Sequence, residues 1–343
     1  MGSIYVVTGG NGFLGNHIVR KLVLAGKKVR AFVLPDSSVA SLNGLDCEIY
    51  YGDVTKEETL RAVFEIPKGD ELIVIHCAAV VYIKDRPNDK VREVNVLGTR
   101  SVVNKCIENH ARLICINSVH AIPEPEDDRE IVEVDHFCAK AVTGIYAKSK
   151  AEAAELVIDC CKNKGLNATI IQPSGMIGPM DYSMTHMTKL IISLAKGTLP
   201  AIVKGGYDFV DVRDVADGVI AAIDKGKAGE CYILSNRYVT IKEISDMVSE
   251  KCFTQKKRFV LPISVAKFFA PFCEAYYNLK KETPLYTRYS LYTLQAKSNF
   301  SHEKASAELG YKPRSLKETI SDMIDWYMKT GIHSETSKSM LKL

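Results

Sequence analysis

Short apolar runs alternate with amphipathic stretches along the first half of the chain. Residues 4–7 form a run rich in β-branched side chains, and apolar positions between Leu14 and Ala25 then recur at three- and four-residue spacing. The first pattern is typical of a buried strand and the second of a helix. Strands separated by helices predict an α/β fold with a doubly wound parallel sheet that is covered on both faces. Further strand-like runs occupy residues 29–33, 47–51, 72–76, 112–116 and 168–171, and long helical patterns occupy 87–107 and 146–162.

The alternation loosens after Pro173. An apolar helix is predicted at residues 187–194, and the run 209–212 with a helix at 213–223 indicates a return to the sheet. A further strand is predicted at 228–234, and helices at 241–251, 302–309 and 315–328. We therefore expect a smaller, mainly helical C-terminal part beside the sheet domain.

Composition is that of an ordinary globular protein. The 343 residues are 46% hydrophobic, and the net charge of +4 is too balanced to indicate a nucleic-acid partner. The ten cysteines include no Cys-x-x-Cys pair, which favours reduced thiols in the cytoplasm over disulfides or a metal site. Because a strand pattern already begins at residue 4, we expect no signal peptide. The apolar segment 260–279 contains Pro262, Pro271, Lys267 and Glu274, so we expect no membrane contact.

A glycine-rich turn joins the first strand to the first helix, in the order Thr-Gly-Gly-Asn-Gly-Phe-Leu-Gly. Gly9 permits a tight turn, Gly12 lets a pyrophosphate approach the backbone, and Gly15 lets the helix lie close to the strand. The helix N-terminus adds free N–H groups and a partial positive charge. The alternative is a turn without a ligand. The position of this glycine-rich turn directly after a first strand favours a dinucleotide site.

A second pattern, Tyr146-Ala-Lys-Ser-Lys150, places a phenol and an ammonium on one face of a helix. A neighbouring positive charge lowers the pKa of a tyrosine, so this pair is a candidate for proton transfer. Ser118 follows the strand at 112–116, where ligands bind in parallel sheets. Asn95 lies in the preceding helix. The alternatives are an exposed helix that happens to carry Tyr and Lys, a strand-end serine, and a locally bonded asparagine.

With these residues in view, the chain resembles the extended short-chain dehydrogenase/reductase family, also called the NAD-dependent epimerase/dehydratase superfamily. It is most similar to the dihydroflavonol reductase, cinnamoyl-CoA reductase and 3β-hydroxysteroid dehydrogenase branch, over about residues 3–328. The motifs that carry the resemblance are the glycine turn, Gly52-Asp53-Val54, His76-Cys-Ala78-Ala79, Asn95-Val-Leu-Gly98-Thr99, the Ser118, Tyr146 and Lys150 set, Gln172-Pro173-Ser174-Gly175-Met-Ile-Gly178-Pro179 and Phe209-Val-Asp211-Val-Arg-Asp214.

The resemblance implies a role for each candidate. Tyr146 is the acid/base, Lys150 binds the nicotinamide ribose and lowers the tyrosine pKa, Ser118 orients the substrate carbonyl, and Asn95 takes part in a proton relay. The implied cofactor-binding set is Gly9, Asn11, Gly12, Phe13, Leu14, Gly15, Leu34, Asp53, Val54, Ala78, Ala79, Tyr146, Lys150, Pro173, Ser174 and Gly175. The implied division is a Rossmann domain at 1–175 and 208–238, a substrate-binding part at 176–207 and 239–330, and a polar tail at 331–343.

The choice between NAD and NADP is usually made at the end of the second strand, by an acidic residue or an arginine. Relatives in the reductase branch often carry Arg where Leu34 stands. Asp36 comes two residues late for the acidic role. Arg30 and Lys28 could supply positive charge nearby, so the sequence leans slightly to NADP.

The favoured function is reduction of a carbonyl, or oxidation of an alcohol, on a hydrophobic or aromatic small molecule. The alternative is a nucleotide-sugar epimerase or dehydratase, although Ser-Val-His stands at 118–120 where dehydratases carry Thr-Asp-Glu. A third alternative is a cofactor sensor without catalytic activity. Extended members of the family often pair the helices that correspond to 87–107 and 146–162, so we expect a homodimer. The predicted substrate contacts are Tyr82, His120, Met176, Met180 and Tyr182, under a lid made of 176–207 and 260–290.

Overall fold

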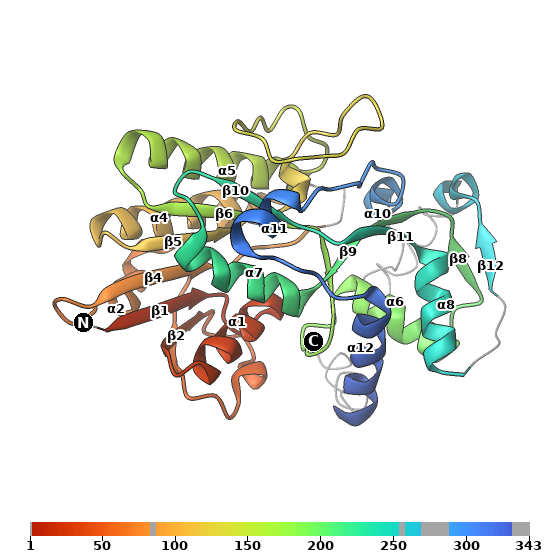
Figure 1. Ribbon diagram of the computed structural model, residues 1–343, viewed down its shortest axis with the longest axis horizontal. Coiled ribbons are helices and arrows are strands. Elements are labelled where there is room, and N and C mark those ends of the chain that lie inside the picture. Colours follow the sequence, from red (N-terminus) through yellow and green to blue (C-terminus); the bar gives the residue numbers. More distant parts are fainter. Residues whose placement is uncertain (1, 83–86, 254–257, 269–287, 331–343) are drawn as a thin grey trace.

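A seven-stranded parallel sheet forms the centre of the protein (Figure 1). This computed structural model describes residues 2–82, 87–253, 258–268 and 288–330. The strand order is β10-β6-β5-β4-β1-β2-β3, so the chain winds outward in both directions from the β1–β4 pair. This order confirms the predicted Rossmann-type doubly wound fold. The strands are β1 (Ser3–Thr8), β2 (Lys28–Val33), β3 (Glu48–Tyr51), β4 (Glu71–His76), β5 (Arg112–Ile116), β6 (Ala168–Pro173) and β10 (Cys231–Leu234).

Helices cover both faces of this sheet. Because side chains alternate along a strand, Val6 and Val7 of β1 enter two different apolar clusters. One cluster packs the sheet against α1 (Phe13–Leu24), α7 (Val212–Lys225) and α11 (Glu303–Leu309). The other packs it against α2 (Arg61–Phe64), α4 (Thr99–Glu108) and α5 (Ile145–Lys164).

The long helix predicted at 87–107 is divided into three parts. It begins as α3 (Asp89–Arg92), widens into a π-helical stretch, η3 (Glu93–Gly98), and continues as α4. The side chain of Asn88 caps the start of α3 by accepting the N–H of Lys90. The π-helical stretch carries Asn95, and single π turns inside helices are frequent at functional sites.

The C-terminal part contains more β-structure than the sequence predicted. The run expected to return to the central sheet instead forms β9 (Gly206–Asp211), which pairs with β7 (Gly175–Ile177) and β11 (Arg237–Thr240). A two-stranded sheet joins β8 (Ala201–Val203) to β12 (Phe259–Leu261). The expected lid residues 269–287 and the polar tail 331–343 lie outside the described residues. The helices of this part are α6 (His186–Ala195), α8 (Ile241–Lys251), α10 (Arg288–Thr293) and α12 (Leu316–Thr330).

The edge strand β10 is covered by the segment 122–144, which connects the short helix η4 (Val119–Ala121) to α5. Glu133 in this segment accepts the N–H of Ile233 at 2.8 Å. Ile131 forms an isolated bridge with Phe300. In the part of the chain that the structure describes, no helix has both the length and the apolar character needed to cross a bilayer.

Candidate active site

The glycine turn between β1 and α1 has the geometry that a phosphate-binding loop requires. Gly9 has a φ of +65°, a left-handed conformation that favours glycine, and its N–H donates to the carbonyl of Phe32 at 2.8 Å. A Cβ atom at Gly15 would lie 2.1 Å from the Gly9 carbonyl oxygen, so only glycine fits there. A Cβ at Gly12 would meet only the Gly9 carbonyl oxygen, at 3.1 Å, and would otherwise point into open space. The turn therefore exposes backbone where a pyrophosphate could approach.

A cleft of about 890 Å³ opens in front of this turn, at the carboxyl ends of β1 to β4. It has the size and position of a dinucleotide site in a doubly wound sheet. Phe13, Leu14 and Gly15 form the first turn of α1, whereas Tyr146, Lys150 and Pro173 to Gly175 lie at α5 and the end of β6. Of the predicted cofactor contacts, the cleft brings together Gly9, Asn11, Gly12, Leu34, Asp53, Val54, Ala78 and Ala79.

Hydroxyl groups that the sequence reasoning missed also line this cleft. The side-chain amide of Asn11 donates to the Ser37 hydroxyl and to the carbonyl of Ser38, each at 2.9 Å. The Ser41 hydroxyl donates to the carbonyl of Asn11 at 2.9 Å. These bonds join the glycine turn to the loop after β2. The residues are ordinary loop serines in the sequence, so only the fold reveals their position.

Arg30 does not supply charge to this cleft, which corrects the sequence-based expectation. Its guanidinium donates to the Glu48 carboxylate and to the carbonyls of Val63 and Glu65. Lys28 stands at the start of β2, opposite to the carboxyl end where the cleft opens. Lys90 is the one Lys or Arg among the described residues that line the cleft.

Ser118, Tyr146 and Lys150 meet at the carboxyl end of β5, and all three side chains are buried. Burial raises the pKa of Tyr146 to about 12, and a hydrogen bond with the Ser118 hydroxyl offsets part of that rise. Burial lowers the pKa of Lys150. Its Nζ donates to the carbonyl of Ile116 at 3.0 Å. Burial therefore dominates the pKa of Tyr146 in this structure, and a lowering of that pKa by Lys150 stays a prediction.

Asn95 forms a clamp between two elements of the site. Its amide oxygen accepts the N–H of Val80 at 2.8 Å, and its amide nitrogen donates to the carbonyl of Val80 and to the Ser149 hydroxyl, each at 3.0 Å. Val80 belongs to the loop after β4, and Ser149 belongs to α5. The geometry thus gives Asn95 a positioning role between the cleft and the helix that carries Tyr146.

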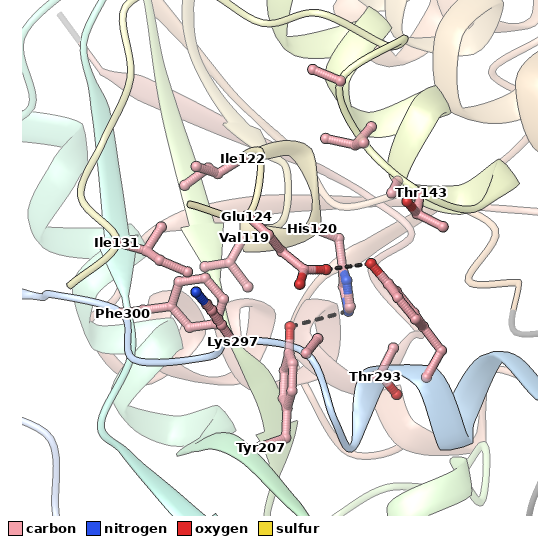
Figure 2. Close-up of a pocket in the computed structure, with 15 residues that line it drawn as sticks. Val119, His120, Ile122, Glu124, Ile131, Thr143, Tyr207, Thr293, Lys297 and Phe300 are labelled. Carbon is pink, nitrogen blue, oxygen red and sulfur yellow. Dashed lines mark hydrogen bonds between the residues drawn. The ribbon is translucent and has the colours of Figure 1, made fainter. Parts of the chain in front are cut away.

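His120 lies at the wall of a second cavity, of about 180 Å³, where Figure 2 shows it beside Tyr207. Its ring stacks on Tyr207 with centroids 5.5 Å apart, and it meets the ring of Tyr146 edge-on at 5.9 Å. The Tyr207 hydroxyl lies 3.3 Å from Nε2 of His120. Burial lowers the pKa of His120 to about 4, so its imidazole is neutral at physiological pH.

The other predicted substrate residues are not found at this cavity. Met176 packs against the apolar cluster that lies between the sheet and helices α1 and α7. Tyr182 lines the dinucleotide cleft. Met180 and Tyr82 line neither cavity. The cavity beside His120 is formed instead by residues from four separate segments, which no local sequence pattern joins. It is lined by Val119, His120, Ile122, Glu124, Ile131, Ala141, Val142, Thr143, Ala147, Tyr207, Tyr292, Thr293, Ala296, Lys297 and Phe300.

The model of one protein family, described as the NAD dependent epimerase/dehydratase family, matches residues 5–235. Sterol demethylase protein B of Methylococcus capsulatus is 28% identical over 338 residues, which cover 95% of this chain and 99% of that protein. A putative dihydroflavonol 4-reductase of Synechocystis sp. is 27% identical over 96% of both chains. Among solved structures, gox2253 is 30% identical, with a TM-score of 0.81 over 96% of this chain and 99% of its own.

Proposed function

The chain belongs to the NAD dependent epimerase/dehydratase family and is an NAD(P)-dependent oxidoreductase, and we propose that it interconverts a carbonyl and an alcohol on a hydrophobic or aromatic small molecule. The observation that carries the proposal is the meeting of Tyr146, Ser118 and His120 beside a cavity that is separate from the dinucleotide cleft. Similarity to a dihydroflavonol reductase over nearly the whole chain supports the same reaction type.

The protonation states favour reduction through proton donation. With a pKa of about 12, Tyr146 keeps its proton at neutral pH and can give it to a substrate oxygen. Ser118 can hold that oxygen by a second hydrogen bond, because its hydroxyl lies beside the phenol. A nicotinamide cofactor held by the glycine turn would supply the hydride. Asn95 joins the loop after β4 to α5 through its hydrogen bonds to Val80 and Ser149.

The charges around the second cavity argue against a diphosphate-bearing substrate. Its one lysine, Lys297, donates to the carbonyls of Glu126 and Asp127, each at 2.6 Å, and lies 3.3 Å from the carboxylate of Asp128. Glu124 adds a negative charge to the lining. The described lining thus pairs one carboxylate with one lysine that is already bonded, and it offers no further cation for the two negative charges of a nucleotide sugar. An uncharged substrate meets no such penalty.

For the cofactor, the cleft supports NAD over NADP. The exposed Ser38, in the loop after Leu34, lines the cleft, and Arg30, the cation that the sequence suggested, is bonded elsewhere. Serine hydroxyls suit the hydroxyl groups of a ribose, whereas a 2′-phosphate calls for a cation such as arginine. We propose NAD(H) as the preferred cofactor.

The test is a substrate screen with both reduced cofactors. Oxidation of NADH and NADPH is followed with aromatic ketones, aldehydes and steroids, and each active pair is repeated with Tyr146→Phe as the control. UDP-glucose is then added as a competitor. We expect turnover of an apolar carbonyl compound and no competition from UDP-glucose. Tight UDP-glucose binding without turnover of any carbonyl compound would instead assign a nucleotide-sugar epimerase.

A further inference from the structure

Four buried polar residues form one hydrogen-bond network at the ends of β1 and β4, which we call the His76 network. Thr8 is the last residue of β1, directly before the glycine turn, and His76 is the last residue of β4. Asn95 lies in the π-helical stretch η3, and Thr99 is the first residue of α4. None of the four residues is more than 4% exposed. Each hydroxyl, amide and ring nitrogen of the network therefore depends on a partner inside the protein.

The partners of His76 determine which of its ring nitrogens carries the proton. The Thr99 hydroxyl donates to the carbonyl of Asn95 at 2.8 Å, so its oxygen is left to accept from Nε2 of His76, 3.1 Å away. Burial lowers the pKa of His76 to about 3, so its imidazole is neutral and has one N–H only. Nδ1 then carries no proton and accepts the Thr8 hydroxyl at 2.7 Å. His76 is therefore held as the tautomer with its hydrogen on Nε2.

One end of the network holds the loop 77–80, which lines the dinucleotide cleft. The N–H of Ala78 donates to the Thr8 hydroxyl at 3.2 Å. A Cβ atom at Gly9 would lie 3.0 Å from the N and Cα atoms of Ala78, so the loop packs directly against the glycine turn. The last residue of the loop is held by two hydrogen bonds to the Asn95 amide. The network thus fixes one wall of the cleft at both of its ends.

The other end of the network holds α5, which carries the candidate acid. The Asn95 amide donates to the Ser149 hydroxyl at 3.0 Å, and that hydroxyl donates to the carbonyl of Tyr146 at 2.7 Å. The Asn95 carbonyl also accepts the Thr99 hydroxyl, which in turn bonds His76. The backbone that carries the Asn95 amide therefore cannot move without disturbing the bond between Thr99 and His76.

We propose that His76 and Thr99 are positioning residues for the reaction, which hold the wall of the dinucleotide cleft at a fixed distance from the helix of Tyr146. The inference rests on the proposed function for the identity of the reacting groups. Hydride transfer and proton donation act on the two neighbouring atoms of one carbonyl group. An error of about 1 Å between their donors therefore lowers the rate although each donor is intact. The alternative is a network that only satisfies buried polar groups and stabilises the fold.

Thr99→Val tests the network at its centre. Valine has nearly the shape of threonine, but it lacks the hydroxyl that accepts from His76 and donates to the Asn95 carbonyl. Thr99→Ser restores a hydroxyl. Ser101→Ala is the matched control, because the Ser101 hydroxyl also donates to a carbonyl four residues earlier, that of Leu97 at 3.2 Å, but this bond is exposed.

Kinetics are measured with NADH and benzil, an uncharged aromatic diketone, and with every active compound of the screen above. NAD⁺ affinity is measured by calorimetry. We expect Thr99→Val to lower kcat about tenfold or more and to leave KM for NADH within about threefold of wild type. The cofactor is less affected because the bond from Ala78 to Thr8 remains in this variant. Thr99→Ser should regain most of the lost kcat, and Ser101→Ala should differ from wild type by less than about twofold.

A second measurement needs neither cofactor nor substrate. Nitrogen–proton correlation spectra of the histidine rings in the purified full chain distinguish the two neutral tautomers. We expect a ring with its hydrogen on Nε2 that keeps this form down to about pH 5, since burial lowers the pKa of His76 to about 3. Its signal should be absent from His76→Asn and should shift in Thr99→Val but not in Ser101→Ala. His76→Asn keeps an acceptor for the Thr8 hydroxyl and loses the donor to Thr99, so its kcat should fall as in Thr99→Val.

The outcomes separate the positioning role from the proposed function. If the wild-type protein binds neither NAD⁺ nor NADP⁺, or reduces no carbonyl compound, the proposed function fails and the positioning role fails with it. If the wild-type protein reduces a carbonyl compound and Thr99→Val does so with the same kcat, the positioning role is overturned and the proposed function remains. A lower melting temperature with unchanged kcat, or an equal loss of kcat in Ser101→Ala, overturns the positioning role as well. If Thr99→Val does not fold, unchanged kcat in His76→Asn overturns it, and a His76 ring with its hydrogen on Nδ1 does so without any kinetics.

Discussion

Nζ of Lys150 lies 6.0 Å from the centre of the Tyr146 ring and donates to the carbonyl of Ile116 rather than to the phenol. The two residues share one face of α5, as their four-residue spacing predicts. Because the Lys150 side chain bonds to the backbone of β5, the position of α5 on the sheet is fixed beside Ser118. Tyr146 then depends on Ser118 rather than on Lys150 for its hydrogen bond.

Tyr146→Phe should remove nearly all turnover, by a factor of about 10² to 10⁴, because only the proton-transferring hydroxyl is lost. Cofactor affinity should stay within a few-fold of wild type, since the ring remains. Steady-state kinetics and NADH titration measure the two effects. Tyr238→Phe serves as the control. Full activity of a folded Tyr146→Phe protein would contradict the catalytic assignment.

Gly12→Val should abolish dinucleotide binding. The added side chain would point from the glycine turn into the cleft, where the backbone must meet the pyrophosphate. Gly12→Ala should give an intermediate loss, because its Cβ meets only the Gly9 carbonyl at 3.1 Å. Titration monitored by nicotinamide fluorescence measures both variants, and circular dichroism checks that they fold. Unchanged affinity would show that the turn binds no phosphate.

Leu34→Arg should move the cofactor preference toward NADP. The side chain of Leu34 is half exposed at the end of β2, next to the Ser37 loop. An arginine there can bind a 2′-phosphate through two parallel hydrogen bonds. We expect kcat/KM for NADPH relative to NADH to rise about tenfold or more. Leu34→Gln, of similar length without charge, should leave the ratio unchanged, and an equal shift in both variants would argue against the charge.

Asp208 should make stability depend on pH. This residue of β9 is 1% exposed, and burial raises its pKa from 3.8 to about 6. The folded protein therefore holds the proton more tightly than the unfolded chain. The resulting contribution to the free energy of unfolding is fully present below pH 4 and is lost as pH rises through about 6. A shift of two pKa units corresponds to about 3 kcal/mol.

Asp208→Asn should consequently raise the melting temperature relative to wild type at pH 8, and the gain should shrink toward pH 4. Calorimetry across this range measures the difference between the two curves. The exposed Asp135→Asn is the matched control and should show no such trend. A difference that is independent of pH would mean that Asp208 does not titrate as described.

A homodimer remains a prediction. It would form through the helices at 87–107 and 146–162, which are α3 to α4 and α5 in the structure. Leu97 on their outer surface is 38% exposed, which leaves apolar area for a partner. Sedimentation at micromolar concentration should give twice the 38.0 kDa chain mass, and Leu97→Glu should shift it toward the monomer. A wild-type species near 38 kDa would contradict the dimer.

Local periodicity predicted the central sheet well, because β1, β4 and β5 contain continuous apolar runs, as expected for strands that are covered on both faces of the sheet. Periodicity predicted the wrong sheet for β9, because the apolar pattern of a strand does not determine which strand it pairs with. It also failed for Arg30, whose partners come from β3, from α2 and from the residue that follows α2.

The candidate site was predictable to the extent that motifs encode it. The glycine turn and the set of Ser118, Tyr146 and Lys150 follow from spacing and from their positions after strands. The Tyr146 pKa could not be predicted, because it depends on how deeply the finished fold buries the phenol. Tyr207 and Thr143 were missed because they reach the second cavity from distant segments.

Glu133 has a consequence beyond the shape of the segment 122–144. An edge strand such as β10 presents unpaired N–H and carbonyl groups that can recruit a strand from another molecule. The carboxylate of Glu133 occupies one of these N–H groups, and the neighbouring residues Glu126, Asp127, Asp128 and Glu130 are exposed and acidic. A second chain that approached this edge would meet both a filled hydrogen-bonding position and like charge. Segment 122–144, which lines part of the second cavity, therefore makes this edge of the sheet a poor template for strand addition.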